Sequence, residues 1–269
     1  MKSFPSIEII KGRLEGLYSL YNDRRYVHPD PLEFLYDYPH PLDRELVGLI
    51  ASSLAYGRVA QILKSISIIL EKMRYSPRSF LMGASKKGLK SAFSGFKHRF
   101  TTGDEVAYML IKAKEIIEEH GSLYRCFLKC FDKDDETVLP ALSLFVKHFN
   151  GKNHPLKNSL MPEPDKGSAC KRLNLFLRWM VREDKVDPGG WTKIPASRLV
   201  IPLDTHIYRI CRAFDMTCRK QADMLAALEI TDYFRQISPE DPVRYDFAIT
   251  RLGIRKDAET GLFFEQFKG

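Results

Sequence analysis

The chain alternates between segments in which apolar residues recur at helical spacing and connecting segments rich in proline, glycine and charge. In residues 5–21, apolar residues recur three or four positions apart from Ile7 to Leu17, which predicts an amphipathic helix. The same spacing predicts helices over 44–56, 59–73, 102–120, 122–132, 137–149, 168–183, 204–214, 219–237 and 239–252. Because the chain has no alternating pattern of useful strand length and no internal repeat, the expected fold class is all-α.

Residues at the predicted helix ends support some of these boundaries. Thr102 and Glu105 have the spacing of a capping box, and Gly121 is placed to end the helix that they open. Asp43 is expected to cap the helix over 44–56, which is followed by a glycine.

The length of the chain, 269 residues, is near the upper size for one hydrophobic core. We therefore expect residues 1–269 to form a single two-lobed helical domain. The central lobe is expected near 41–165, and 1–40 with 166–269 would form the second lobe and the hinge.

The composition is that of a folded protein and excludes several classes of function. Apolar residues make up 44% and charged residues 28% of the chain. No stretch approaches the roughly 20 apolar residues of a membrane span, and no secretory signal is recognisable, which predicts a cytoplasmic protein without a membrane partner. The five cysteines form no CxxC pair and the histidines have no HExxH spacing, so neither a metal nor another cofactor is expected. Glycine-rich nucleotide-binding motifs and a GxSxG elbow are also missing.

The charge balance favours a polyanionic partner. Lysine and arginine number 42 against 34 acidic residues, which gives a net charge of +8 and a pI near 9.1. Neutralising phosphates releases counterions and drives association with nucleic acids. A basic surface that serves solubility alone is the alternative.

Two long loops, over 150–167 and 184–202, flank one predicted helix and run into helix starts that carry Lys171 and Asp204. Loops longer than about 12–15 residues are uncommon in compact domains and are often functional. These two helix starts are therefore where chemistry is expected.

Lys171 could act as a nucleophile, and Asp204 could stabilise a positive charge that forms during the reaction. Lys171 would lie in the first turn of a helix capped by Ser168, where the helix dipole and the apolar surroundings disfavour the ammonium. A neutral amine is the form that attacks a sugar C1′. Asp204 would cap the next helix, whose N–H groups keep the carboxylate ionised and ready to stabilise an oxocarbenium ion. A surface lysine and a helix cap without a further role are the alternative interpretations.

Four stretches carry a resemblance to a known superfamily. IPLDTHIYRICRAF resembles the (V/L)DTH(I/V)xR motif of the helix-hairpin-helix DNA glycosylases, the endonuclease III and adenine glycosylase group, and Asp204 falls on the catalytic aspartate of that motif. CKRLNLFLR resembles the helix in which a nucleophilic lysine is followed three residues later by asparagine; here these are Lys171 and Asn174. ELVGLIASSLAYGR and YDFAITRLGI are similar to the helix before the DNA-wedging loop and to the helix that closes the catalytic core.

The spacing of the motifs refines the resemblance. Lys171 and Asp204 are 33 positions apart (204 − 171), which is most similar to the archaeal 8-oxoguanine DNA glycosylases. As a whole, the chain is identified as a member of an uncharacterised bacterial family with the signature SACKRLNLFLRWMVR…IPLDTHIYRI, whose function is unassigned. The LPGxG hairpin, whose N–H groups bind a DNA phosphate, is reduced to Gly167, and the four-cysteine loop is missing. The resemblance therefore implies the two-lobed glycosylase fold without an iron–sulfur cluster.

The resemblance also implies an activity. A DNA repair glycosylase with lyase activity would flip an oxidised or otherwise altered nucleotide out of double-stranded DNA. Lys171 would attack C1′ and form a Schiff base while Asp204 stabilises the cationic sugar. The alternative is a non-catalytic DNA- or RNA-binding relative that keeps the glycosylase-like core.

Further residues near these motifs are expected to contact the ligand. The expected nucleic-acid contacts are Tyr56, Arg58, Arg172, Trp191, His206, Arg209 and Arg212, and the expected base-pocket residues are Tyr245 and Asp246. Each also has a structural interpretation. The aromatic residues would then pack the core, the histidine would tie down a loop, the arginines would be solvated, and the aspartate would cap its helix or pair with an arginine.

Overall fold

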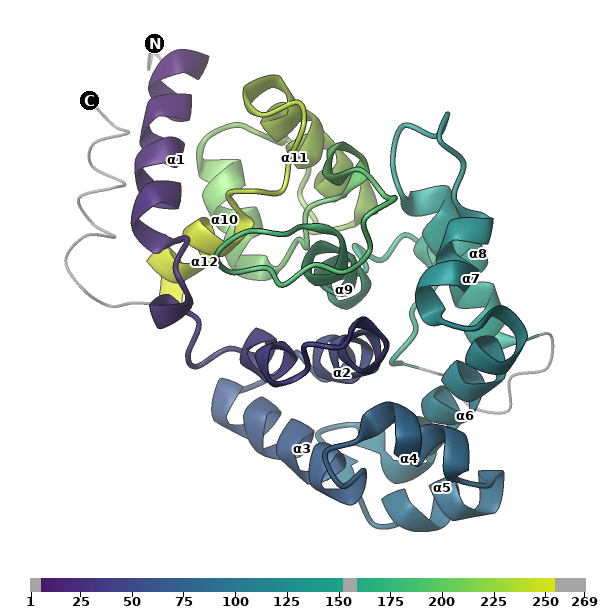
Figure 1. The fold of residues 1–269 in the computed structure, drawn as a ribbon. Helices are drawn as coiled ribbons and strands as arrows, with labels where there is room; N and C mark the ends of the chain where they lie inside the picture. Colours follow the sequence, from purple (N-terminus) through teal and green to yellow (C-terminus); the bar gives the residue numbers. More distant parts are fainter. Residues whose placement is uncertain (1–5, 152–158, 255–269) are drawn as a thin grey trace.

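The computed structural model describes residues 6–151 and 159–254, and in this part the chain is mostly helical, as predicted (Figure 1). The α-helices are α1 (Ile7–Tyr21), α2 (Pro41–Ser53), α3 (Val59–Lys72), α4 (Pro77–Gly83), α5 (Lys86–Phe93), α6 (Gly103–His120), α7 (Leu123–Cys130), α8 (Leu139–Asn150), α9 (Lys171–Val181), α10 (Thr205–Ala213), α11 (Met224–Ile237) and α12 (Asp246–Ile254). Short 3-10 turns are η1 (Arg24–Tyr26), η2 (Pro31–Asp37), η3 (Pro164–Lys166) and η4 (Ala196–Arg198). An antiparallel pair, β1 (Lys97–His98) and β2 (Thr101–Thr102), leads into α6.

The ends of α6 follow the sequence signals. The Thr102 hydroxyl accepts the N–H of Glu105, the Glu105 carboxylate accepts the N–H of Thr102, and together they form the predicted capping box. Gly121 ends the helix in the left-handed region, with φ 87°. Both ends depend on local chemistry, which is why the sequence predicted them.

Two predicted caps are wrong. Helix α2 begins two residues before Asp43 and is capped by His40, while the Asp43 carboxylate accepts the N–H of Arg78. Helix α9 is preceded by Cys170 in the left-handed region, and the Ser168 hydroxyl accepts the N–H of Cys170 rather than capping the helix. The Asp43 side chain therefore joins α2 to the start of α4, whereas the Ser168 side chain holds the turn that precedes α9.

Other boundaries also shift. The segment predicted as a helix over 239–252 is a turn up to Tyr245, and α12 begins at Asp246. Helix α11 begins at Met224 rather than near 219, because Asp223 caps it. Helices α4 and α5 were not predicted, since each is short and its apolar residues are too few to show a period.

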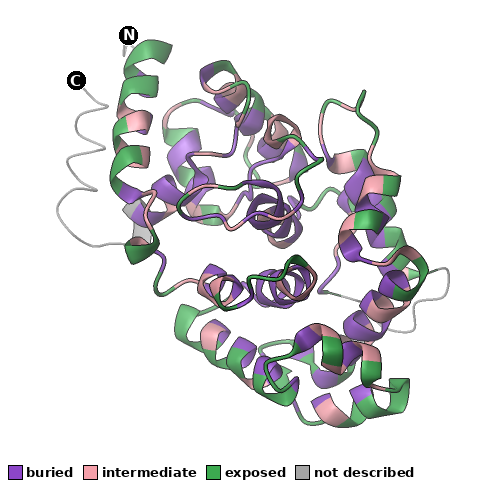
Figure 2. Cartoon of the chain, viewed as in Figure 1, coloured by how far each residue is buried: buried purple, intermediate pink, exposed green. Residues whose placement is uncertain are grey.

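Helices α2 and α9 pack against each other and lie at the middle of the molecule (Figure 1). Helices α1, α10, α11 and α12 lie on one side of this pair, and α3 to α8 lie on the other. Residues coloured as buried lie on the faces that the helices turn toward each other (Figure 2), and nearly all of the buried apolar residues form one contiguous core. The division into lobes at 41 and 165 stays a prediction.

Buried arginines hold α9 in place. Arg178 bonds Asp187 through Nε and Nη2, at 3.2 and 2.9 Å, and its Nη1 pairs with Asp246 of α12. Arg182 pairs with Asp187 and, at 2.9 Å, with Asp241. Because each buried carboxylate faces a guanidinium, the network fixes the position of α9 against α12.

Among the described residues, none of the helices is both long enough and apolar enough to cross a bilayer.

Candidate functional site

Lys171 and Asp204 lie side by side. The Lys171 Nζ is 3.1 Å from Asp204 Oδ2, and the two side chains are 36% and 23% exposed. Both residues line an inner cavity and a wider outer groove, so they lie at the boundary between the two. A solvent-accessible amine and a carboxylate therefore share one hollow.

The starts of two helices position this pair. Asp204 caps α10, and its Oδ1 accepts the N–H groups of His206 and Ile207 at 2.9 and 2.8 Å, which leaves Oδ2 for Lys171. Lys171 is the first residue of α9. Burial opposes ionisation of Asp204, but the Lys171 ammonium and the two N–H groups outweigh it, and the pKa of Asp204 lies below its ordinary value. The carboxylate is therefore ionised in this state, with the Lys171 Nζ 3.1 Å from it.

The inner cavity has a volume of about 320 Å³, which is at the lower end of small-molecule sites. Lys171, Leu175 and Arg178 recur on one face of α9 and form one wall. The other walls come from the segment that leads into η2, the loop between α2 and α3, the start of α3, and helices α10 and α12. The lining is mainly apolar.

Two polar atoms on residues that line the cavity are left without a hydrogen-bond partner. They are the Asp246 Oδ1 and the Trp179 Nε1, and both are buried. Burial raises the pKa of Asp246 to about 6, although its ion pair with Arg178 partly offsets this. Since buried polar atoms normally have partners, a ligand that offers one donor and one acceptor would satisfy them.

The outer groove has a volume of about 660 Å³ and is built from the segments around two helix starts. It is lined by residues 167–172, which lead into α9, and by residues 203–206, which lead into α10. Gly167, with φ 81°, turns the chain toward α9. The start of α9 has no side-chain cap, whereas Asp204 accepts N–H groups at the start of α10. The part of the groove at the α9 start therefore suits an anionic ligand such as a phosphate.

Tyr56 and Arg172 reach the groove but are held by other contacts. The Tyr56 hydroxyl lies 2.9 Å from the His98 carbonyl oxygen and 2.7 Å from the Thr101 hydroxyl. Arg172 donates to the Ser53 carbonyl at 2.7 Å, and its guanidinium lies 5.0 Å from the centre of the Tyr56 ring. Their contact with a nucleic acid stays a prediction.

Trp191 and Tyr245 do not lie where their predicted roles require. Each is 1% exposed. Trp191 stacks on Tyr124 at 5.4 Å in the core, so the packing interpretation is correct and stacking on a base is wrong. The Tyr245 hydroxyl donates to Glu15 of α1, and Tyr245 does not line the cavity. Its side chain joins α1 to the turn before α12, and its assignment to the base pocket is wrong.

The remaining predicted contacts are placed as follows. Arg58 is exposed at the start of α3, next to Gly57 of the cavity lining. Arg209 and Arg212 are exposed on α10. His206 lines the outer groove, and its Nε2 is buried without a hydrogen-bond partner. These positions are compatible with phosphate contacts, which stay predictions.

Sequence reasoning missed three residues near the site. Arg178 and Trp179 line the cavity, and the spacing of Arg178 from Lys171, seven positions, was the signal that could have found it. Phe100 is 80% exposed at the tip of the β1–β2 turn, beside Arg99, which lies over the Tyr56 ring. No periodic pattern predicts an exposed aromatic residue in a turn, so this residue needed the tertiary structure.

The fold and the site define a helical protein with a lysine–carboxylate pair at the mouth of a mainly apolar cavity. The model of the family described as "protein of unknown function (DUF2400)" matches residues 30–255, and the chain belongs to that family. The membership in a family of unassigned function, expected from the signature, is thereby confirmed. Comparison with curated proteins and with solved structures gave no match.

Proposed function

We propose that this protein is a DNA glycosylase with associated lyase activity on an oxidised or otherwise altered base. The observation that carries the proposal is the distance of 3.1 Å between the Lys171 amine and the Asp204 carboxylate, at the boundary between a cavity and a groove. The resemblance of both segments to the helix-hairpin-helix glycosylases supports the same assignment. The glycosylase-like fold is part of this proposal.

The inner cavity would receive the flipped base, and the outer groove would hold the DNA backbone. The Trp179 N–H and the Asp246 carboxylate offer a donor and an acceptor to the edge of a base. The starts of α9 and α10 would face the phosphates beside the flipped nucleotide. Phe100 is the exposed aromatic residue that would fill the gap left in the stack.

The reaction begins from the ion pair and transfers the ammonium proton. As the C1′–N bond breaks, its electron pair leaves with the base, which takes a proton from Lys171 Nζ directly or through Asp204. Asp204 stabilises the cationic sugar that forms. The neutral amine then attacks C1′, and a second amine proton passes to the ring oxygen as the sugar opens to the iminium.

Borohydride trapping on a panel of duplexes with single altered bases tests the proposal. Reduction of the iminium links Lys171 covalently to the DNA, and Lys171→Ala is expected to abolish the adduct. Lys86→Ala is a matched control, because Lys86 also begins a helix and pairs with a carboxylate, that of Glu115, at 2.6 Å. Asp204→Asn, which keeps an N-cap acceptor, is expected to slow trapping about 100- to 1000-fold. An adduct of unchanged yield with Lys171→Ala would overturn the assignment.

One observation favours a second candidate, a non-catalytic DNA- or RNA-binding relative. In the free protein the Lys171 Nζ is already engaged by the Asp204 carboxylate, at 3.1 Å. In that case, binding of duplex DNA or RNA would depend on salt, and no duplex in the panel would yield a trapped adduct or a released base.

A further inference from the structure

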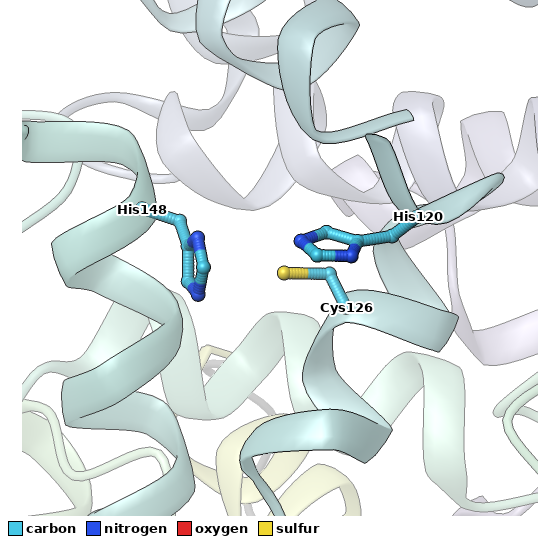
Figure 3. A group of neighbouring side chains, drawn as sticks. All are labelled: His120, Cys126 and His148. Carbon is cyan, nitrogen blue, oxygen red and sulfur yellow. The ribbon is translucent and has the colours of Figure 1, made fainter. Parts of the chain in front are cut away.

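Side chains from three helices converge beside a surface cavity that shares no lining residue with the cavity and the groove at the Lys171–Asp204 pair. His120 is the last residue of α6, Cys126 lies within α7, and His148 lies in the last turn of α8. One nitrogen of each imidazole and the Cys126 sulfur all lie within 4.8 Å of one another. Figure 3 shows the three side chains pointing into the same space.

Cys130 adds a fourth donor of the same kind. It follows Cys126 by four residues and therefore lies on the same face of α7. Its thiol lies near enough to the Cys126 thiol and to His148 to interact with both. Together with His120 and His148 it lines a surface cavity of about 660 Å³. Two imidazoles and two thiols thus meet where α6, α7 and α8 come together.

The buried His120 ring is the second observation that points to a ligand. The side chain is 6% exposed, and its Nε2 is buried without a hydrogen-bond partner. The Glu119 carboxylate lies 3.6 Å from this nitrogen. Leaving a buried polar nitrogen unsatisfied costs about 1–3 kcal/mol, and coordination would use its lone pair.

We propose that His120, Cys126, Cys130 and His148 form a tetrahedral site for one zinc ion. A Cys₂His₂ donor set is a closed structural zinc site, with Zn–S bonds of about 2.3 Å and Zn–N bonds of about 2.0–2.1 Å. These lengths place ligand atoms about 3.3–3.8 Å apart. The ligand atoms of His120, Cys126 and His148, which lie within 4.8 Å of one another, would move together by up to about 1 Å, and the Cys130 sulfur would turn toward them. Sulfur and imidazole donors favour zinc over magnesium or calcium, which take oxygen ligands.

The charge and proton balance of the site is simple. Coordination of the two thiols releases their protons to solvent, and the two thiolates neutralise the charge of Zn²⁺. Lys129 Nζ lies 3.2 Å from His120 Nδ1. Binding through Nε2 leaves the proton on Nδ1, so the exposed Lys129 side chain would move away from the ring.

The proposed zinc ion would tie together the ends of α6 and α8 and the body of α7. Neither Lys171 nor Asp204 belongs to the cluster, so its role is in stability rather than in the proposed reaction. The sequence expectation of no metal rested on the missing CxxC pair. Here the cysteines have helical CxxxC spacing, and the histidines come from neighbouring helices.

Cobalt substitution tests the site on the full chain. After treatment with a chelator and a reductant, the protein is titrated with Co²⁺, and the visible and near-ultraviolet absorption is recorded. We expect one equivalent to give the intense d–d bands of tetrahedral cobalt and thiolate-to-cobalt charge transfer, both removed by one equivalent of Zn²⁺. His148→Ala is expected to weaken Co²⁺ binding at least about 100-fold, because removing a ligand should cost no less than removing a supporting residue.

Controls separate the site from adventitious binding. Cys218→Ser and His28→Ala remove an exposed cysteine and an exposed histidine elsewhere and are expected to leave the titration unchanged. His148 is exposed, so circular dichroism should show that its variant is folded. Tetrahedral bands that persist in His148→Ala and Cys130→Ser, or a wild-type spectrum without them, would overturn the proposal. A disulfide between Cys126 and Cys130 in freshly purified protein, with no bound metal, would overturn it as well.

Discussion

Individual residues at the candidate site combine structural and chemical roles. Asp204 uses one carboxylate oxygen to cap α10 and the other to pair with Lys171. Asp246, which lines the cavity, pairs with Arg178 through one carboxylate oxygen. Its other carboxylate oxygen is buried and has no hydrogen-bond partner. Because the structural contact fixes the carboxylate, the second oxygen is held in place without freedom to rotate.

The raised pKa of Asp246 makes stability depend on pH. Burial lifts the pKa from an ordinary 3.8 to about 6, so the folded state binds this proton more tightly than the unfolded state. The stabilisation of the folded state by the proton on Asp246 is fully present below pH about 4, and it is lost as the pH rises through about 6. The free energy of unfolding of the wild type minus that of Asp246→Asn should therefore fall by about 2–3 kcal/mol between pH 4 and 7.

Urea unfolding at a series of pH values measures this difference. Other titrating groups are common to both proteins and cancel in the subtraction. A difference that is flat from pH 4 to 7, or that rises, would contradict the raised pKa of Asp246.

At the scale of elements, close backbone contacts decide how the helices meet. Helix α5 packs against α6, and a Cβ added at Gly103 would lie 1.8 Å from the Phe93 carbonyl oxygen. Glu45 of α2 accepts the N–H groups of Leu123 and Tyr124 at the start of α7, both at 3.0 Å. Short helices such as α5 therefore form because tertiary contacts stabilise them, since their own propensity is too weak.

Gly103→Ala is expected to destabilise the protein by at least about 2 kcal/mol, because the backbone of Phe93 cannot yield to the added methyl group. Gly83→Ala is the matched control. Gly83 is also helical, and a Cβ there would meet no atom within 4 Å. Its substitution should be neutral or stabilise by up to about 1 kcal/mol. Thermal and urea unfolding of both variants test the contact, and equal effects would contradict it.

At the scale of the whole molecule, the net charge of +8 bears on the proposed partner. The groove is built from helix starts, and the exposed Arg58, Arg209 and Arg212 lie on the elements around it. A protein with this net charge would attract DNA without orienting it, and contacts in the groove would then orient the bound DNA.

The dependence of DNA binding on salt tests the location of the contact. If Arg58 binds a phosphate, Arg58→Ala should lower the slope of log K against log salt by about 1. Lys90→Ala removes an exposed cation on α5, away from the groove, and is expected to leave the slope unchanged. Fluorescence anisotropy at several salt concentrations measures both. Equal slopes for wild type and Arg58→Ala would contradict the contact.

The sequence by itself determined the helical class, most of the long helices, the capping box of α6 and the identity of Lys171 and Asp204 as a pair to examine. The helical class, the helices and the capping box depend on apolar periodicity and on residues close together in the chain, which a single sequence displays. Lys171 and Asp204, 33 positions apart, were singled out by the resemblance of their segments to known motifs. The tertiary structure alone decided that the pair lies 3.1 Å apart at the edge of a cavity and that Trp191 and Tyr245 are buried. It also decided that Trp179 lines the cavity, that Phe100 is exposed and that the side chains of the His120 cluster come together. The physical reason is that these properties arise between segments distant in sequence, and their side chains are placed by packing rather than by local propensity.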